Sequence, residues 1–188
     1  MVEQKMDKEA TLKRIVEIEL HMFERVKASQ PSLCQERPEA FKTMRTMTHS
    51  ALSAETLASY LDDLYRAMSE GKNLLTLKYA RMEGKLVALK DNPLIEELVK
   101  TEQRWMAELA EKYPHVIKGG PGFAPYLSAE LETYSDKTLD LYFRDVSNAE
   151  KEGRNLAEER YQFLFQKIGY GTLAEAEEKA SKSKDGGV

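Results

Sequence analysis

The chain contains an internal repeat, because residues 53–82 recur at residues 135–164 without a gap and at a constant offset of 82. Eleven of the thirty aligned positions are identical, whereas composition alone would give roughly two. A repeat is built from copies of one supersecondary unit, so it constrains the architecture more than any single residue does. The identical pairs are Ser53/Ser135, Thr56/Thr138, Leu57/Leu139, Tyr60/Tyr142, Asp63/Asp145, Ala67/Ala149, Glu70/Glu152, Gly71/Gly153, Asn73/Asn155, Leu74/Leu156 and Tyr79/Tyr161.

Each copy predicts two helices joined by a tight turn. The copy opens with a serine that is suited to cap the first helix. A glycine suited to end that helix is followed, two residues later, by an asparagine suited to cap the next one. These three pairs are Ser53/Ser135, Gly71/Gly153 and Asn73/Asn155.

A further helix precedes each copy. Apolar residues at spacings of three and four predict a helix over residues 8–27, and the same stripe recurs from residue 93 at an offset of 83. Both stripes carry a carboxylate at the same place on the apolar face, Glu19 in the first and Glu102 in the second. Shorter helices are expected over residues 39–49 and 125–131.

These patterns predict an all-α fold in a single domain, residues 1–180. We expect two divergent three-helix repeats, residues 8–84 and 93–168, which pack about a pseudo-two-fold axis. A short C-terminal helix follows the second repeat. Residues 181–188 are polar and glycine-rich, and we expect them to form a disordered tail.

Composition excludes several classes of protein. The net charge of −4 and the pI near 5.6 give no basic footprint, so nucleic acid is not an expected partner. Cys34 is the only cysteine, which excludes an intramolecular disulfide and indicates a reducing compartment. No segment approaches the roughly 18 apolar residues of a membrane span, and the charged amino terminus lacks the apolar core of a secretory signal. We therefore expect a cytoplasmic protein without membrane contact.

A polar row lies along the flank of the repeated helix. Thr56, Tyr60 and Asp63 stand at spacings of four and three, so they share one face of a helix, and all three recur in the second copy. If the copies pack about a two-fold axis, the row and the two stripe glutamates approach the centre. The candidate catalytic or metal-ligating residues are Glu19, Asp63, Glu102 and Asp145. The candidate ligand contacts are Tyr60, Tyr142, Thr56, Thr138 and Cys34.

Buried carboxylates must be protonated, hydrogen-bonded, paired with a cation or bound to a metal, and this leaves three interpretations. In the first, each aspartate accepts a hydrogen bond from a neighbouring hydroxyl and each glutamate pairs with an arginine, which gives a packing network. In the second, the four carboxylates hold Mg, Mn or Ca, because an all-oxygen site suits these ions. In the third, they form an acidic pocket for an amine or another cationic small molecule, with a carboxyl as general acid or base.

The chain carries three kinds of motif. The Thr-Leu-x-x-Tyr-x-x-Asp pattern and the Glu-Gly-Lys/Arg-Asn-Leu turn each occur twice, and Ser32-Leu33-Cys34-Gln35 occurs once. Together with the segment that contains Tyr170, these motifs resemble a bacterial family of about this length, the domain of unknown function number four-one-two-five. The resemblance covers most of the chain and implies no activity, substrate or cofactor. It supports testing Glu19, Cys34, Tyr60, Asp63, Tyr142 and Asp145.

The sequence therefore predicts a small-molecule enzyme or binding protein with a carboxylate and tyrosine pocket between two helical repeats. As an enzyme it would be a lyase, hydrolase or isomerase that is cofactor-free or dependent on a divalent metal, because no nucleotide, flavin or pyridoxal motif is present. The alternative is a non-catalytic helical protein that acts through a homodimer or other partner contacts. In that alternative the polar row is a packing network.

Overall fold

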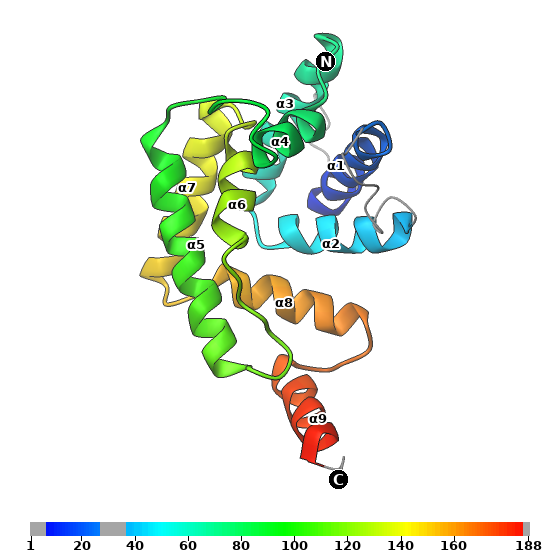
Figure 1. Ribbon diagram of the computed structural model, residues 1–188, viewed down its shortest axis with the longest axis vertical. Coiled ribbons are helices and arrows are strands. Elements are labelled where there is room, and N and C mark those ends of the chain that lie inside the picture. Colours follow the sequence, from blue (N-terminus) through cyan, green and yellow to red (C-terminus); the bar gives the residue numbers. More distant parts are fainter. Residues whose placement is uncertain (1–6, 27–36, 186–188) are drawn as a thin grey trace.

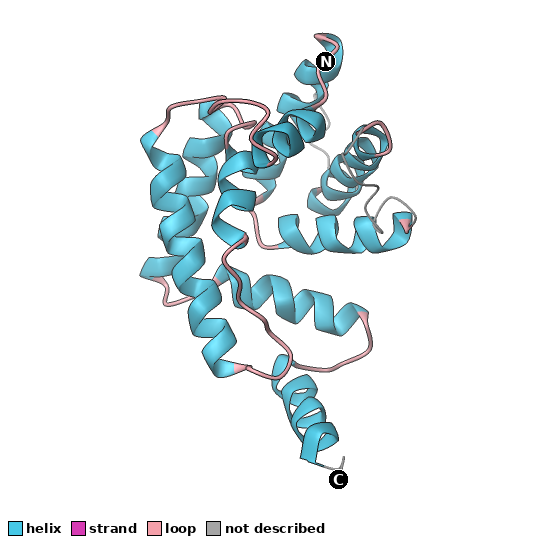
Figure 2. Cartoon of the chain, viewed as in Figure 1, coloured by secondary structure: helices cyan, strands magenta, loops and turns pink. Residues whose placement is uncertain are grey.

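A computed structural model describes residues 7–26 and 37–185. Within these two ranges all regular structure is helical, with nine helices and no strand (Figure 2). The predicted all-α class is confirmed. No helix in the described ranges combines the length and the apolar character that a bilayer span requires.

Four helices form each half of the chain, so the expected count of three helices in each repeat was too low, because the short helices predicted over residues 39–49 and 125–131 belong to these sets. Pro38 begins the extra helix of the first half, at a position where its missing N–H is not needed. The helices of the first half are α1 (Lys8–Phe23), α2 (Pro38–Ser50), α3 (Ala54–Ser69) and α4 (Leu74–Met82). Those of the second half are α5 (Pro93–Lys112), α6 (Phe123–Leu131), α7 (Asp136–Lys151) and α8 (Leu156–Lys167), and α9 (Leu173–Asp185) follows.

The predicted caps and turns of the repeat form as expected. At the starts of α3 and α7, the side chains of Ser53 and Ser135 each accept the backbone N–H of the residue three positions later, at 3.2 Å. Gly71 and Gly153 adopt φ of +68° and +67°, the left-handed region that favours glycine. The next asparagine in each copy caps α4 or α8. Local sequence therefore fixes both helix pairs.

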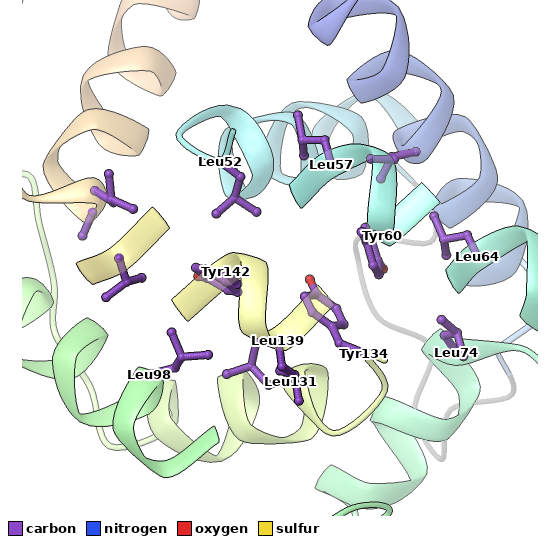
Figure 3. Close-up of a cluster of buried hydrophobic side chains, with 14 of the residues drawn as sticks. Leu52, Leu57, Tyr60, Leu64, Leu74, Leu98, Leu131, Tyr134, Leu139 and Tyr142 are labelled. Atoms are coloured by element: carbon purple, nitrogen blue, oxygen red, sulfur yellow. The ribbon is translucent and has the colours of Figure 1, made fainter. Parts of the chain in front are cut away.

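The helices of the two halves pack across one another (Figure 1). Helices α3 and α7 contact each other, α2 lies against α8, and α4 lies against α6. Helix α1 packs on the other three helices of its half, and α5 does the same in the second half. Leucines and tyrosines from both halves meet in one apolar cluster (Figure 3), where the rings of Tyr60 and Tyr134 lie 4.5 Å apart. The two halves thus share a single core.

Helix α9 contacts α8 at one end of the molecule (Figure 1). The carboxylate of Glu177 ties it to the turn after α5 by accepting the backbone N–H groups of His115 at 3.0 Å and Val116 at 3.2 Å. We expected a disordered tail from residue 181, but α9 continues to Asp185. Ion pairs four residues apart support this extension. They are Lys179–Glu175 and Lys182–Glu178.

Candidate functional site

The first of two buried charge clusters surrounds Glu19 on α1, whose side chain is fully buried. Arg45 on α2 donates to both carboxylate oxygens, at 2.5 Å from Nη2 and 2.9 Å from Nε. The Tyr60 hydroxyl donates to Oε1 at 2.8 Å, and His49 Nε2 lies 3.0 Å from the same oxygen. Three helices of the first half therefore meet at one carboxylate.

The same cluster reaches into the second half through Glu130 on α6. Arg45 donates to both oxygens of Glu130, at 3.0 and 2.8 Å. Lys78 Nζ lies 2.5 Å from Oε2, and the Tyr134 hydroxyl donates to Oε1 at 3.0 Å. The Lys78 ammonium is buried and also lies 3.5 Å from the centre of the Tyr126 ring. This set forms a polar bridge between the halves, which we call the bridging cluster.

The cations of the bridging cluster keep its two glutamates ionised. Burial alone would raise the pKa of Glu19, but the adjacent Arg45 and His49 outweigh burial and lower it to about 2. Burial opposes ionisation of Glu130 as well, and Arg45 with Lys78 holds its pKa well below the usual range. Burial and the nearby carboxylates raise the pKa of Tyr60. At neutral pH both carboxylates are therefore ionised and the phenol is protonated.

The second charge cluster is smaller and belongs entirely to the second half. Arg160 on α8 forms a two-pronged pair with Glu102 on α5, at 2.7 Å from Nη1 and 2.8 Å from Nη2. The Tyr142 hydroxyl donates to Glu102 Oε1 at 2.7 Å and accepts from Arg160 Nη2 at 3.0 Å. Burial raises the pKa of Tyr142, although Arg160 acts in the opposite direction. We call this set the closed triad.

The two aspartates of the repeated row cap helices of the opposite half. Asp63 Oδ2 on α3 accepts the Ser135 backbone N–H at 2.9 Å and the Thr138 hydroxyl at 2.6 Å, at the start of α7. Asp145 on α7 makes the same two hydrogen bonds at the same distances with the start of α3, where the partners are Ser53 and Thr56. The aspartates thus satisfy free N–H groups at the helix starts across the α3–α7 contact.

The four predicted carboxylates do not form one group. Each aspartate caps a helix of the opposite half, and each glutamate binds an arginine in a separate charge cluster. Within residues 7–26 and 37–185, no group of three or more His, Cys, Asp or Glu side chains is arranged to hold a metal ion. Cys34 lies outside the described residues.

A cavity of about 240 Å³ reaches both charge clusters. Five helices line it: α2, α5, α6, α7 and α8. Its lining includes Arg45 and Glu130 of the bridging cluster and all three residues of the closed triad, together with apolar side chains. The lining residues are Met44, Arg45, Met47, Thr48, Glu102, Met106, Phe123, Tyr126, Leu127, Glu130, Tyr142, Ala157, Arg160 and Tyr161.

Only part of the predicted site lines this cavity. Glu102 and Tyr142 do so. The other described candidates hold helices together instead, through the bridging cluster or the reciprocal caps. They are Glu19, Asp63, Asp145, Tyr60, Thr56 and Thr138.

The packing-network interpretation paired each glutamate with an arginine, but the sequence did not identify Arg45 and Arg160 as those partners. The buried face of α2 carries Arg45 and His49 beside Phe41 and Met47, so two of its four buried residues are polar. Lys78 and Arg160 occupy aligned positions of the repeat. A count of similar residues, and not only of identical ones, would have identified that pair.

Comparison with known proteins gives a family and no activity. No curated protein and no solved structure matches this chain. The family described as "Protein of unknown function (DUF4125)" matches residues 9–178, which is nearly the whole chain. It therefore covers both halves of the fold, the two charge clusters and the cavity. The chain belongs to this family.

Proposed function

We propose that this protein binds a small molecule in the cavity between its two halves. The observation that carries the proposal is the mixed lining of one cavity, to which residues of both charge clusters and methionine, leucine and phenylalanine residues all contribute. Ligand sites combine an apolar surface with a few fixed polar groups in this way. Both halves contribute to the lining, so the site depends on their association.

Binding is favoured over acid–base catalysis. A general acid or base works best when its pKa lies near the operating pH. Although burial opposes ionisation of Glu130, the charges of Arg45 and Lys78 hold its pKa well below neutrality. Burial raises the pKa of Tyr142, which moves it further above neutrality. Glu102 accepts three hydrogen bonds from the closed triad. The pKa shifts of Glu130 and Tyr142 therefore move both groups away from the range that suits a general acid or base at neutral pH.

We also propose that the halves are divergent copies related by an approximate two-fold axis, with four helices in each. Two observations support this arrangement. The contact of α2 with α8 corresponds to that of α6 with α4, and Asp63 and Asp145 make reciprocal caps of equal length.

A thermal-unfolding screen of small molecules tests the binding proposal, because a ligand of the folded state raises its stability by mass action. The decisive variant is Ala157→Leu, since Ala157 is buried, lines the cavity and is aligned with Leu75 in the first half. We expect at least one compound to stabilise the native protein and to lose its effect in this variant. Ala58→Leu, which adds the same atoms to an exposed position of α3, is the control. Equal stabilisation of both variants by every active compound would overturn the proposal.

A further inference from the structure

The charged residues that line the cavity expose little surface. Arg45 is paired with Glu19 and Glu130, and Arg160 is paired with Glu102. The side chains of all five residues are 10% exposed or less. A charged ligand would have to compete with these ion pairs for a partner, and a buried charge without a partner is unfavourable. The paired residues therefore hold the walls of the cavity together and offer a ligand little polar surface.

The surface that the cavity does expose is mostly apolar. Three methionines contribute to the lining, Met44, Met47 and Met106, together with Leu127 and Phe123. The polar lining residues outside the two charge clusters carry no charge, apart from the ring hydroxyls and one threonine. They are Thr48, Tyr126 and Tyr161. Methionine is flexible and polarizable, so it adapts its shape to a bound ring. A ligand in this cavity would therefore gain affinity chiefly by burying apolar surface.

The volume of the cavity sets the size of such a ligand. An apolar cavity of about 150 Å³ holds a single benzene ring. The cavity between the halves measures about 240 Å³. It therefore has room for a second fused ring, whereas one ring alone would leave part of the apolar lining without contacts.

We propose that the cavity binds uncharged, apolar molecules of up to two fused rings. This inference rests on the proposed function and specifies the class of ligand. It differs from the amine or other cationic molecule expected from the sequence, because the carboxylates that line the cavity already have their cations. Glu102 is paired with Arg160, and Glu130 is paired with Arg45 and Lys78.

The test titrates the native protein with four probes: naphthalene, benzene, 2-naphthoate and 2-naphthylmethylamine. NMR spectra of the methionine methyl groups report where a probe binds. Met47 and Met106 line the cavity, whereas Met22, which is buried like Met47, does not and is the control. We expect naphthalene to shift the first two resonances and to leave that of Met22 unmoved.

The affinities from the same titrations test the class of ligand. Naphthalene should bind at least about tenfold more tightly than benzene, because its second ring buries additional apolar surface. It should also bind at least about tenfold more tightly than either charged probe, because burial of an unpaired charge is unfavourable. In Ala157→Leu, which adds atoms to the cavity lining, the shifts caused by naphthalene should disappear.

The possible failures differ. If benzene or either charged probe binds in the cavity as tightly as naphthalene, the inferred ligand class is wrong and binding in the cavity stands. The same conclusion follows if no probe shifts Met47 or Met106 while a compound of the thermal-unfolding screen loses its effect in Ala157→Leu. If no probe and no screened compound binds, or if every compound that binds the native protein binds Ala157→Leu equally, the proposed function fails and the inference fails with it. The comparison of probes uses the native protein, so it stays decisive even if Ala157→Leu does not fold.

Discussion

The two halves differ in the surroundings of their aligned buried glutamates, Glu19 and Glu102. Around Glu19 the space is filled, because the rings of Phe23 and Phe41 stack with centres 4.4 Å apart, and Arg45 reaches across to Glu130. Around Glu102 the cavity remains. There Met106 is aligned with Phe23, and Ala157 with Leu75. Smaller or more flexible side chains at these two positions leave the second half open where the first is packed.

This difference contrasts with the polar row, which is the same in both copies of the sequence repeat. In the row that both copies keep, the two aspartates join the copies through reciprocal caps, whereas each tyrosine binds the glutamate of its own half. The cavity lining includes positions that agree between the copies, such as Glu102 and Tyr142, and positions that differ, such as Met106 and Ala157. The differing positions therefore distinguish the surroundings of Glu102 from those of Glu19.

Loss of Arg45 should have the largest effect on stability. Arg45→Met leaves Glu19 and Glu130 without their main counter-charge, and the removal of one partner from a buried ion pair costs about 3–5 kcal/mol. Arg160→Met leaves only Glu102 without a counter-charge, so it should lower the free energy of unfolding by less. The free energy of unfolding in urea measures both. Arg104→Met is the control, because its ion pairs with Glu108 and Glu150 are about half exposed and should contribute less than about 1 kcal/mol. Equal losses for Arg45→Met and Arg160→Met would refute the asymmetry between the clusters.

Acid should weaken the bridging cluster through Glu19. Its pKa falls from the ordinary 4.5 to about 2 on folding, so its contribution is complete above pH 4.5 and is lost as the pH falls toward 2. A shift of this size corresponds to about 3 kcal/mol. Urea midpoints of the native protein and of Glu19→Gln, measured across this window, should show a shallower pH dependence in the variant. Parallel curves would mean that Glu19 is not ionised against Arg45 in the folded state.

Much of the fold was predictable, because its signals are local. Capping serines, left-handed glycines and apolar periodicity are read from neighbours in the chain, so the helix pairs of the repeat were predicted almost to the residue. The partners of Glu19 were not predictable in the same way. Arg45 lies 26 residues away from Glu19, and the second carboxylate that Arg45 binds, Glu130, comes from the other half. Which cation meets which carboxylate depends on the packing of helices, and no spacing in the sequence records it.

Both aspartate caps should contribute equally, despite the asymmetry of the halves. Asp63→Asn and Asp145→Asn each weaken two hydrogen bonds of matching length at the start of a helix. The expected cost is about 1–2 kcal/mol for each, the usual worth of a cap. Urea unfolding of the two variants measures the costs side by side. A difference of more than about 1 kcal/mol between them would show that the α3–α7 contact is less symmetric than its hydrogen bonds.

The smallest effect is expected where the second half is open. Ala157→Leu adds three carbon atoms beside a cavity, so we expect stability to change by less than about 1 kcal/mol, while the same substitution at fully buried Ala149, which does not line the cavity, should cost about 1–3 kcal/mol through overpacking. Thermal unfolding of both variants gives the comparison. Similar large losses would mean that the space beside Ala157 does not accept added atoms. The first half already carries leucine at the aligned position, Leu75, so a tolerated Ala157→Leu would reproduce in the second half the packing that closes the first.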